Sequence, residues 1–79
     1  MARLKDKIKT PKVILVRKED DLEVIINYLK NKEEVIVNVS LISLSYSYRI
    51  IDFLSGYVMG LNGTRKKIED KIYSFKLWL

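Results

Sequence analysis

The chain has 79 residues, 48% of them hydrophobic, and a formal net charge of +5, which indicates one globular domain and argues against disorder. It contains no cysteine and no histidine, so disulfides and thiolate or imidazole metal sites are excluded. A chain this short buries only about 60% of the surface that its unfolded form exposes, and without a covalent or metal staple this favours a homo-oligomer.

The basic charge is concentrated at the N-terminus, where residues 1–18 carry seven lysine or arginine residues and one acidic residue. Residues 1–11 are predicted to form a basic arm, and residues 12–79 the folded core domain. Such an arm either binds acidic lipid or nucleic acid without specificity or is a solvated tail. Because the sequence has no apolar run long enough to span a bilayer and no secretory signal, we predict a cytoplasmic protein.

Three elements are predicted in the first half of the chain. Residues 13–16, a short apolar run rich in β-branched residues, are predicted to form a strand that is buried on both faces. A helix is predicted over residues 21–31, with Asp20 as its N-cap and Glu23 completing a capping box. Residues 35–39 are predicted to form a second apolar strand.

A long helix is predicted over residues 45–63. Ser43 or Ser45 is suited to cap its start, and Asn62 or Gly63 to occupy the left-handed position past its last turn. Most of the helix circumference is apolar. Four apolar residues are expected to point at the sheet: Ile50, Leu54, Val58 and Leu61.

A hairpin is predicted to follow, with arms at residues 64–68 and 72–77. The element order is therefore β-α-β-α-β-β. Because the first two connections are helical crossovers, the first two strands should be parallel to each other, and the hairpin adds antiparallel pairing. We predict an α/β fold, a two-layer sandwich of two helices on a mixed sheet of four to five strands.

One stripe of the long helix is small and polar. Its members recur at helical spacing: Ser45, Arg49, Asp52, Gly56 and Gly60. Each glycine inside a helix costs about 1 kcal/mol relative to alanine. The two glycines therefore indicate that another backbone approaches this stripe closely, either that of a partner or that of the chain's own sheet.

Two surfaces are candidates for self-association. Two helices cover only one face of the predicted sheet, so the apolar side chains on its other face favour a face-to-face dimer with a second copy. The long helix offers the other surface, where aromatic, methionine and arginine residues flank the glycines. The residues predicted for a dimer or polymer interface on this helix are Gly56, Tyr57, Met59 and Gly60.

The long helix also carries a resemblance to a known family. The run RIIDFLSG at residues 49–56, followed by Gly60 and Asn62-Gly63, resembles the signature helix of SepF, a cell-division protein of bacteria and archaea. The resemblance extends from Lys12 to about Leu77. It implies a dimeric adaptor with the capacity to polymerise, which binds the C-terminal tail of the tubulin-like protein FtsZ and links FtsZ filaments to the membrane at the division site.

The resemblance also implies which residues bind the FtsZ tail. The positions that match are Arg49 and Phe53. Tyr48 is the third predicted tail-binding residue, at a position before the arginine where the family often has a lysine. SepF-type proteins usually begin with a membrane-binding amphipathic helix. Here the resemblance implies membrane contact through a segment that is absent or vestigial.

We predict neither an enzyme nor a cofactor or metal site. Asp52 is the only carboxylate on the long helix, and we interpret it as an ion-pair partner of Arg49. The Gly56–Gly60 segment lacks the Gly-Lys-Ser/Thr ending of a phosphate-binding loop.

A small basic nucleic-acid-binding α/β module is the alternative function. A pI of about 9.5, the basic arm and the Arg65-Lys66-Lys67 strand favour it. The sequence lacks the aromatic pattern of an RNA-recognition motif and the GXXG loop of the KH type, which argues against it.

Overall fold

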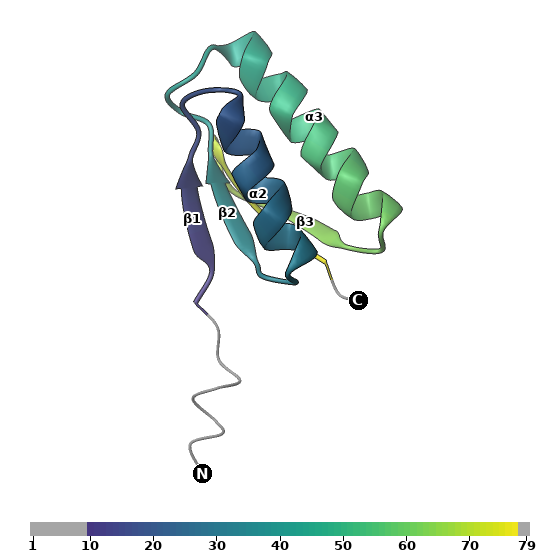
Figure 1. The fold of residues 1–79 in the computed structure, drawn as a ribbon. Coiled ribbons are helices and arrows are strands. Elements are labelled where there is room, and N and C mark those ends of the chain that lie inside the picture. The colour runs from purple at the N-terminus through teal and green to yellow at the C-terminus, as the bar shows by residue number, and fades with distance from the viewer. Residues whose placement is uncertain (1–9, 78–79) are drawn as a thin grey trace.

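Two helices lie on one face of a four-stranded sheet in the structure, a computed structural model that describes residues 10–77 (Figure 1). The elements, in chain order, are β1 (Lys12–Leu15), α2 (Asp20–Lys30), β2 (Val35–Asn38), α3 (Leu44–Gly60), β3 (Thr64–Glu69) and β4 (Ile72–Lys76). The predicted order β-α-β-α-β-β and the two-layer α/β architecture are confirmed. Within residues 10–77, the sheet has four strands and no fifth.

The strands are arranged in the order β1-β2-β4-β3. β1 and β2 are parallel, as their helical crossover predicts, while β4 is antiparallel to both β2 and β3. The hairpin therefore does not simply extend the sheet outward, because β4 inserts next to β2 and leaves β3 at the edge.

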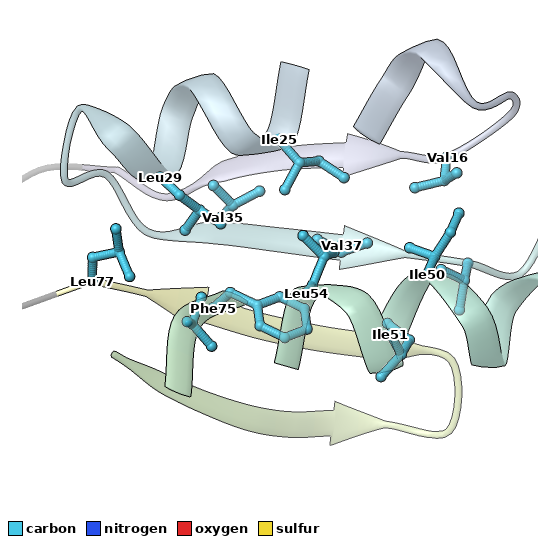
Figure 2. Packing of buried hydrophobic residues seen from close by; sticks show 12 residues of the cluster. Val16, Ile25, Leu29, Val35, Val37, Ile50, Ile51, Leu54, Phe75 and Leu77 are labelled. Atoms are coloured by element: carbon cyan, nitrogen blue, oxygen red, sulfur yellow. The ribbon is translucent and has the colours of Figure 1, made fainter. Parts of the chain in front are cut away.

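The core lies between the sheet and the two helices (Figure 2). Ile25 of α2 and Leu54 of α3 have no exposed surface, and neither do Val37 of β2 and Phe75 of β4. The antiparallel register places Val35 opposite Phe75, so these two side chains share the helix-covered face. Burial of such apolar side chains is the main source of stability in a domain of this size.

No helix among residues 10–77 covers the other face of the sheet (Figure 1). Alternation along the strands places Val13 and Ile36 there, and Val13 is 69% exposed. The prediction that the first strand is buried on both faces is therefore wrong. The uncovered face is also more polar than predicted, since Ser74 lies on it and donates a hydrogen bond to the Glu34 carboxylate at 2.6 Å.

The start of α2 differs from the prediction. Asp20 is not the N-cap, because Glu19 holds that position and its side chain makes no capping hydrogen bond. The Asp21 carboxylate instead accepts hydrogen bonds from the backbone N–H groups of Arg17 (2.8 Å) and Lys18 (3.1 Å). These two bonds stabilise the ionised form and lower the pKa of Asp21 below its ordinary value of 3.8.

The ends of α3 follow the sequence closely. Of the two predicted caps, Ser43 is the one used, since its hydroxyl accepts a hydrogen bond from the backbone N–H of Tyr46 at 3.2 Å. Asn62 adopts the predicted left-handed conformation, with a φ of 62°, and ends the helix. The chain turns away there, so Leu61 is 40% exposed and the prediction that it points at the sheet is wrong.

Candidate functional site

α3 has two faces with different surroundings. Ile50, Leu54 and Val58 point into the core as predicted, and Ser47 and Ile51 are buried beside them. On the outward side, three large side chains are more than half exposed: Tyr48 at 60%, Phe53 at 52% and Met59 at 63%. Exposed aromatic and methionine side chains on the outward side of one helix are typical of a binding surface.

The small, polar stripe runs along the middle of this outward face. All five of its members are exposed: Ser45, Arg49, Asp52, Gly56 and Gly60. A Cβ atom added at Gly56 or Gly60 would meet no atom within 4 Å, so neither glycine lets α3 approach its own sheet. The fold of a single copy therefore gives no steric reason for either glycine.

Arg49 and Asp52 do not form the predicted ion pair. No nitrogen–oxygen contact of 4 Å or less joins them, and neither has another ion-pair partner among residues 10–77. Both charges stand on the exposed helix face. They are therefore available to a binding partner.

A first groove lies between the start of α2 and the first half of α3, and it encloses about 170 Å³. Phe53 and Arg49 both line it, so the structure brings these two predicted tail-binding residues together. The residues that line the first groove are Glu19, Leu22, Tyr46, Arg49, Ile50 and Phe53.

The first groove combines apolar walls with two opposite charges. Glu19 stands on the α2 side and Arg49 on the α3 side, and neither makes an ion pair with any residue that the structure describes. Ile50 and Leu22 supply apolar lining between them. This arrangement suits a peptide with an apolar anchor residue and charged neighbours.

Tyr48 does not line the first groove. It lines a second groove on the opposite flank of α3, between the start of that helix and the β3–β4 hairpin, which encloses about 240 Å³. The residues that line the second groove are Val39, Leu44, Ser47, Tyr48, Ile51, Lys67, Asp70, Lys71 and Tyr73. The structure thus separates Tyr48 from Arg49 and Phe53.

The contribution of α2 to the first groove was missed in the sequence. The sequence patterns predict a helix here but assign neither Glu19 nor Leu22 to a binding site. A signal was present, because α2 follows β1 and α3 follows β2. When two strands are parallel, the helices that follow them begin at the same edge of the sheet, and ligand sites form there.

The basic strand β3 is exposed along its whole length, from Thr64 to Glu69. Part of its charge is used within the fold, since Arg65 donates a hydrogen bond to Ser55 of α3 at 3.3 Å and lies 5.9 Å from the centre of the Tyr73 ring. Lys67 lies 4.0 Å from Asp70. The predicted basic arm, residues 1–11, falls mostly outside the described residues.

Neither a metal-ion site nor a membrane-spanning helix is found among residues 10–77. No group of three or more acidic, cysteine or histidine residues is placed to hold a metal ion in residues 10–77. No helix in the same part of the chain has the length and apolar character needed to cross a bilayer.

A family model described as cell division protein SepF matches residues 12–75. The chain belongs to the SepF family. The cell division protein SepF of Halalkalibacterium halodurans is 39% identical over 67 residues, which are 82% of this chain and 44% of that protein. The SepF of Acetivibrio thermocellus is 36% identical over 64 residues, which are 78% of this chain and 41% of that protein.

A third relative is the SepF of Thermoanaerobacter pseudethanolicus, which is 41% identical over 64 residues, 78% of this chain and 47% of that protein. The chain therefore spans less than half the length of these SepF relatives. The match covers all six elements of the fold, including the helix that carries both grooves.

Proposed function

We propose that this SepF-family domain is a cell-division adaptor that binds the C-terminal tail of FtsZ in the first groove. The observation that carries the proposal is that an exposed Phe53 and an Arg49 with no ion-pair partner among residues 10–77 line one groove, on the helix that resembles the family's signature. The family membership supports the cell-division role. The choice of the FtsZ tail rests on the resemblance.

The chemistry of the first groove indicates how a short peptide docks. An apolar side chain of the tail packs against Phe53 and Ile50, and a tail carboxylate meets Arg49, whose guanidinium suits a bidentate contact. Glu19 on the opposite wall accepts a basic group of the same peptide. Groove-type recognition of this kind obtains its affinity from the few side chains that become fully desolvated.

The outward face of α3 is the surface that we assign to a second copy in a homodimer. Gly56 and Gly60 leave the backbone open there, and Met59 and the half-buried Tyr57 flank them. Close approach of two helices needs such small residues at the crossing point. The uncovered sheet face is the weaker candidate because its apolar side chains are interrupted by polar ones such as Ser74.

The link to the membrane at the division site rests on the family resemblance. Residues 1–9 fall outside the described part of the chain. A dimer that binds two tails would hold two FtsZ subunits at once, and this raises the effective affinity for a filament without any new contact.

Isothermal titration calorimetry with a synthetic FtsZ tail peptide tests the proposal. Phe53→Ala should weaken binding at least tenfold, since it removes an aromatic anchor of the first groove, and should leave the circular dichroism spectrum unchanged. Tyr48→Ala is the matched control, because Tyr48 is an equally exposed aromatic residue of α3 that lines only the second groove.

The outcomes are distinct. If Phe53→Ala binds the tail peptide with unchanged affinity, Phe53 is not part of the binding site. Loss of binding in Tyr48→Ala alone would move the site to the second groove. Absence of any heat signal with the unmodified protein would contradict the proposed function itself.

A further inference from the structure

The second groove has no part in the proposed tail site, yet it is the larger of the two. Its lining is apolar at Val39 and Ile51, which are buried, and at Leu44, which is 54% exposed. Lys67 and Lys71 stand at its rim. It is therefore shaped for an apolar side chain with negatively charged neighbours.

The electrostatics of the second groove favour an acidic partner. Its wall includes the first turn of α3, which contains no acidic residue and whose N-terminal dipole end is positive. Lys71 has no ion-pair partner among residues 10–77. The only carboxylate at the rim is that of Asp70, which is 90% exposed and lies at the 4.0 Å limit of an ion pair with Lys67.

A surface of matching character exists on the same chain, at the start of α2. Asp20, Glu23 and Val24 are all exposed and lie on one face of this helix, because positions i, i+3 and i+4 are neighbours on a helix surface. Val24 is 42% exposed, so the acidic face carries an apolar side chain. Neither acidic side chain has an ion-pair partner in the part of the chain that the structure describes.

We propose that the second groove of one copy takes the acidic face of α2 from another copy. Val24 enters the apolar part of the groove, while Asp20 and Glu23 meet Lys67 and Lys71. Charge complementarity of this kind fixes the register of a contact and accelerates association. The proposal is independent of the tail site, because Phe53 and Arg49 take no part in it.

The contact joins two different surfaces of the chain, so it is heterologous. Each copy would present one groove and one acidic helix face, and the contact repeats head to tail until the copies close into a ring or extend as a filament. The two-fold dimer assigned to the outward face of α3 is a separate contact. The two together would build an assembly larger than a dimer.

A second copy fits the second groove better than a nucleic acid does. Besides the rings of Tyr48 and Tyr73, the lining includes three aliphatic residues, Val39, Leu44 and Ile51, which suit the side chain of a protein partner but offer no stacking surface to a base. Asp70 at the rim repels a phosphate backbone. The acidic helix face supplies both the negative charge that pairs with the lysines and the apolar side chain that the groove accommodates.

A charge-swap experiment tests the contact. One variant carries Lys67→Glu and Lys71→Glu, which makes the groove acidic, and the other carries Asp20→Lys and Glu23→Lys, which makes the helix face basic. In low salt, light scattering should show that the unmodified protein gains mass with concentration, and each variant alone should stay at the mass of the two-fold dimer. An equimolar mixture should regain the larger mass, since every groove then meets a helix face of opposite charge.

The control variant is Lys30→Glu with Lys66→Glu, which changes the net charge by the same amount as the groove variant at exposed sites that do not line the second groove. It should assemble like the unmodified protein. An assembly that high salt leaves intact, or that either swap leaves at full mass, would overturn the proposal. So would a mixture of the two swaps, both folded by circular dichroism, that fails to regain mass.

Two further readouts separate this proposal from others. Calorimetry with the FtsZ tail peptide should give the same affinity for the groove variant as for the unmodified protein. The proposal of the tail site and the proposal of the assembly contact can therefore be disproved separately. A gel shift on generic RNA that is lost in the Lys67→Glu, Lys71→Glu variant, with self-assembly unchanged, would overturn the proposal in favour of a nucleic-acid surface.

Discussion

The inward and outward faces of α3 are built from the same helix but obey different constraints. Leu54 and Val58 on the inward face have no exposed surface and pack in the core, so the fold of a single copy requires them. Phe53 and Met59 on the outward face are more than half exposed, and a Cβ atom added at Gly56 would meet no atom within 4 Å. The outward residues are therefore to be explained by a partner rather than by the fold.

The three glycines of the chain repeat this contrast. A Cβ atom at Gly63 would collide with the Lys76 carbonyl oxygen and would lie 3.0 Å from the Val58 carbonyl oxygen. Gly63 thus lets the chain pass close to β4 as it leaves α3. Gly56 and Gly60 have open space around them, so only a contact with another molecule would give them a similar role.

The largest expected effect comes from the inward face. Leu54→Ala should destabilise the domain by about 2–5 kcal/mol, because it removes buried apolar contacts and leaves a cavity. Chemical denaturation followed by circular dichroism measures this loss. A change in the free energy of unfolding below about 0.5 kcal/mol, the level usual for surface substitutions, would contradict the distinction between the two faces.

Gly63→Ala is expected to destabilise the domain by about 1–3 kcal/mol, since the new methyl group has to displace backbone atoms in a packed site. The same denaturation experiment measures it. An unchanged denaturation midpoint would show that β4 shifts at this position without loss of stability. Gly63 would then have no steric role.

Gly56→Ala should have the opposite sign. An alanine fits there without a clash, and it should stabilise the isolated domain by about 0.5–1 kcal/mol through the lower conformational entropy of the unfolded chain. The same change should weaken the proposed dimer, as analytical ultracentrifugation would show. If the variant is more stable but dimerises as before, the outward face of α3 around Gly56 is not the dimer contact.

The smallest expected effect concerns a contact outside α3. The pKa of Asp21 is lowered by the hydrogen bonds from the Arg17 and Lys18 backbone, so its contribution to stability is fully present above the ordinary value of 3.8. That contribution is lost as the pH falls through the lower pKa of the folded state. Asp21→Asn should therefore reduce the decline of stability in this acid range.

A series of denaturation curves between neutral and acid pH measures this effect. The inward face of α3 contains no ionisable group, so Leu54→Ala should leave the acid dependence unchanged and serves as the control. Equal acid dependence in Asp21→Asn and in the unmodified protein would contradict the assigned hydrogen bonds.

Much of the fold follows from local sequence signals. The apolar runs, the helix-capping Ser43 and the left-handed Asn62 are short-range features, and each was predicted and confirmed. The start of α2 was mispredicted because Asp20 and Asp21 are both suited to bind backbone N–H groups. The choice of Asp21 depends on the path of Arg17 and Lys18, which the sequence does not specify.

The functional surface was less predictable. The helical period places Tyr48 and Phe53 on the outward side of α3, but it does not say what stands beside them. The two grooves arise because α2 packs on one flank of α3 and the hairpin on the other, and this depends on the strand order β1-β2-β4-β3. For the same reason Val13 was predicted to be buried, because one apolar strand does not reveal which sheet face lacks a helix.

The most direct test of the central claim, that the outward face of α3 is a partner surface, is a titration of the isotope-labelled domain with FtsZ tail peptide followed by NMR. We predict that the backbone signals of Leu22, Arg49 and Phe53 shift together and saturate, with little change at Tyr73 in the second groove. Shifts confined to the uncovered sheet face, or no shifts at saturating peptide, would contradict the account.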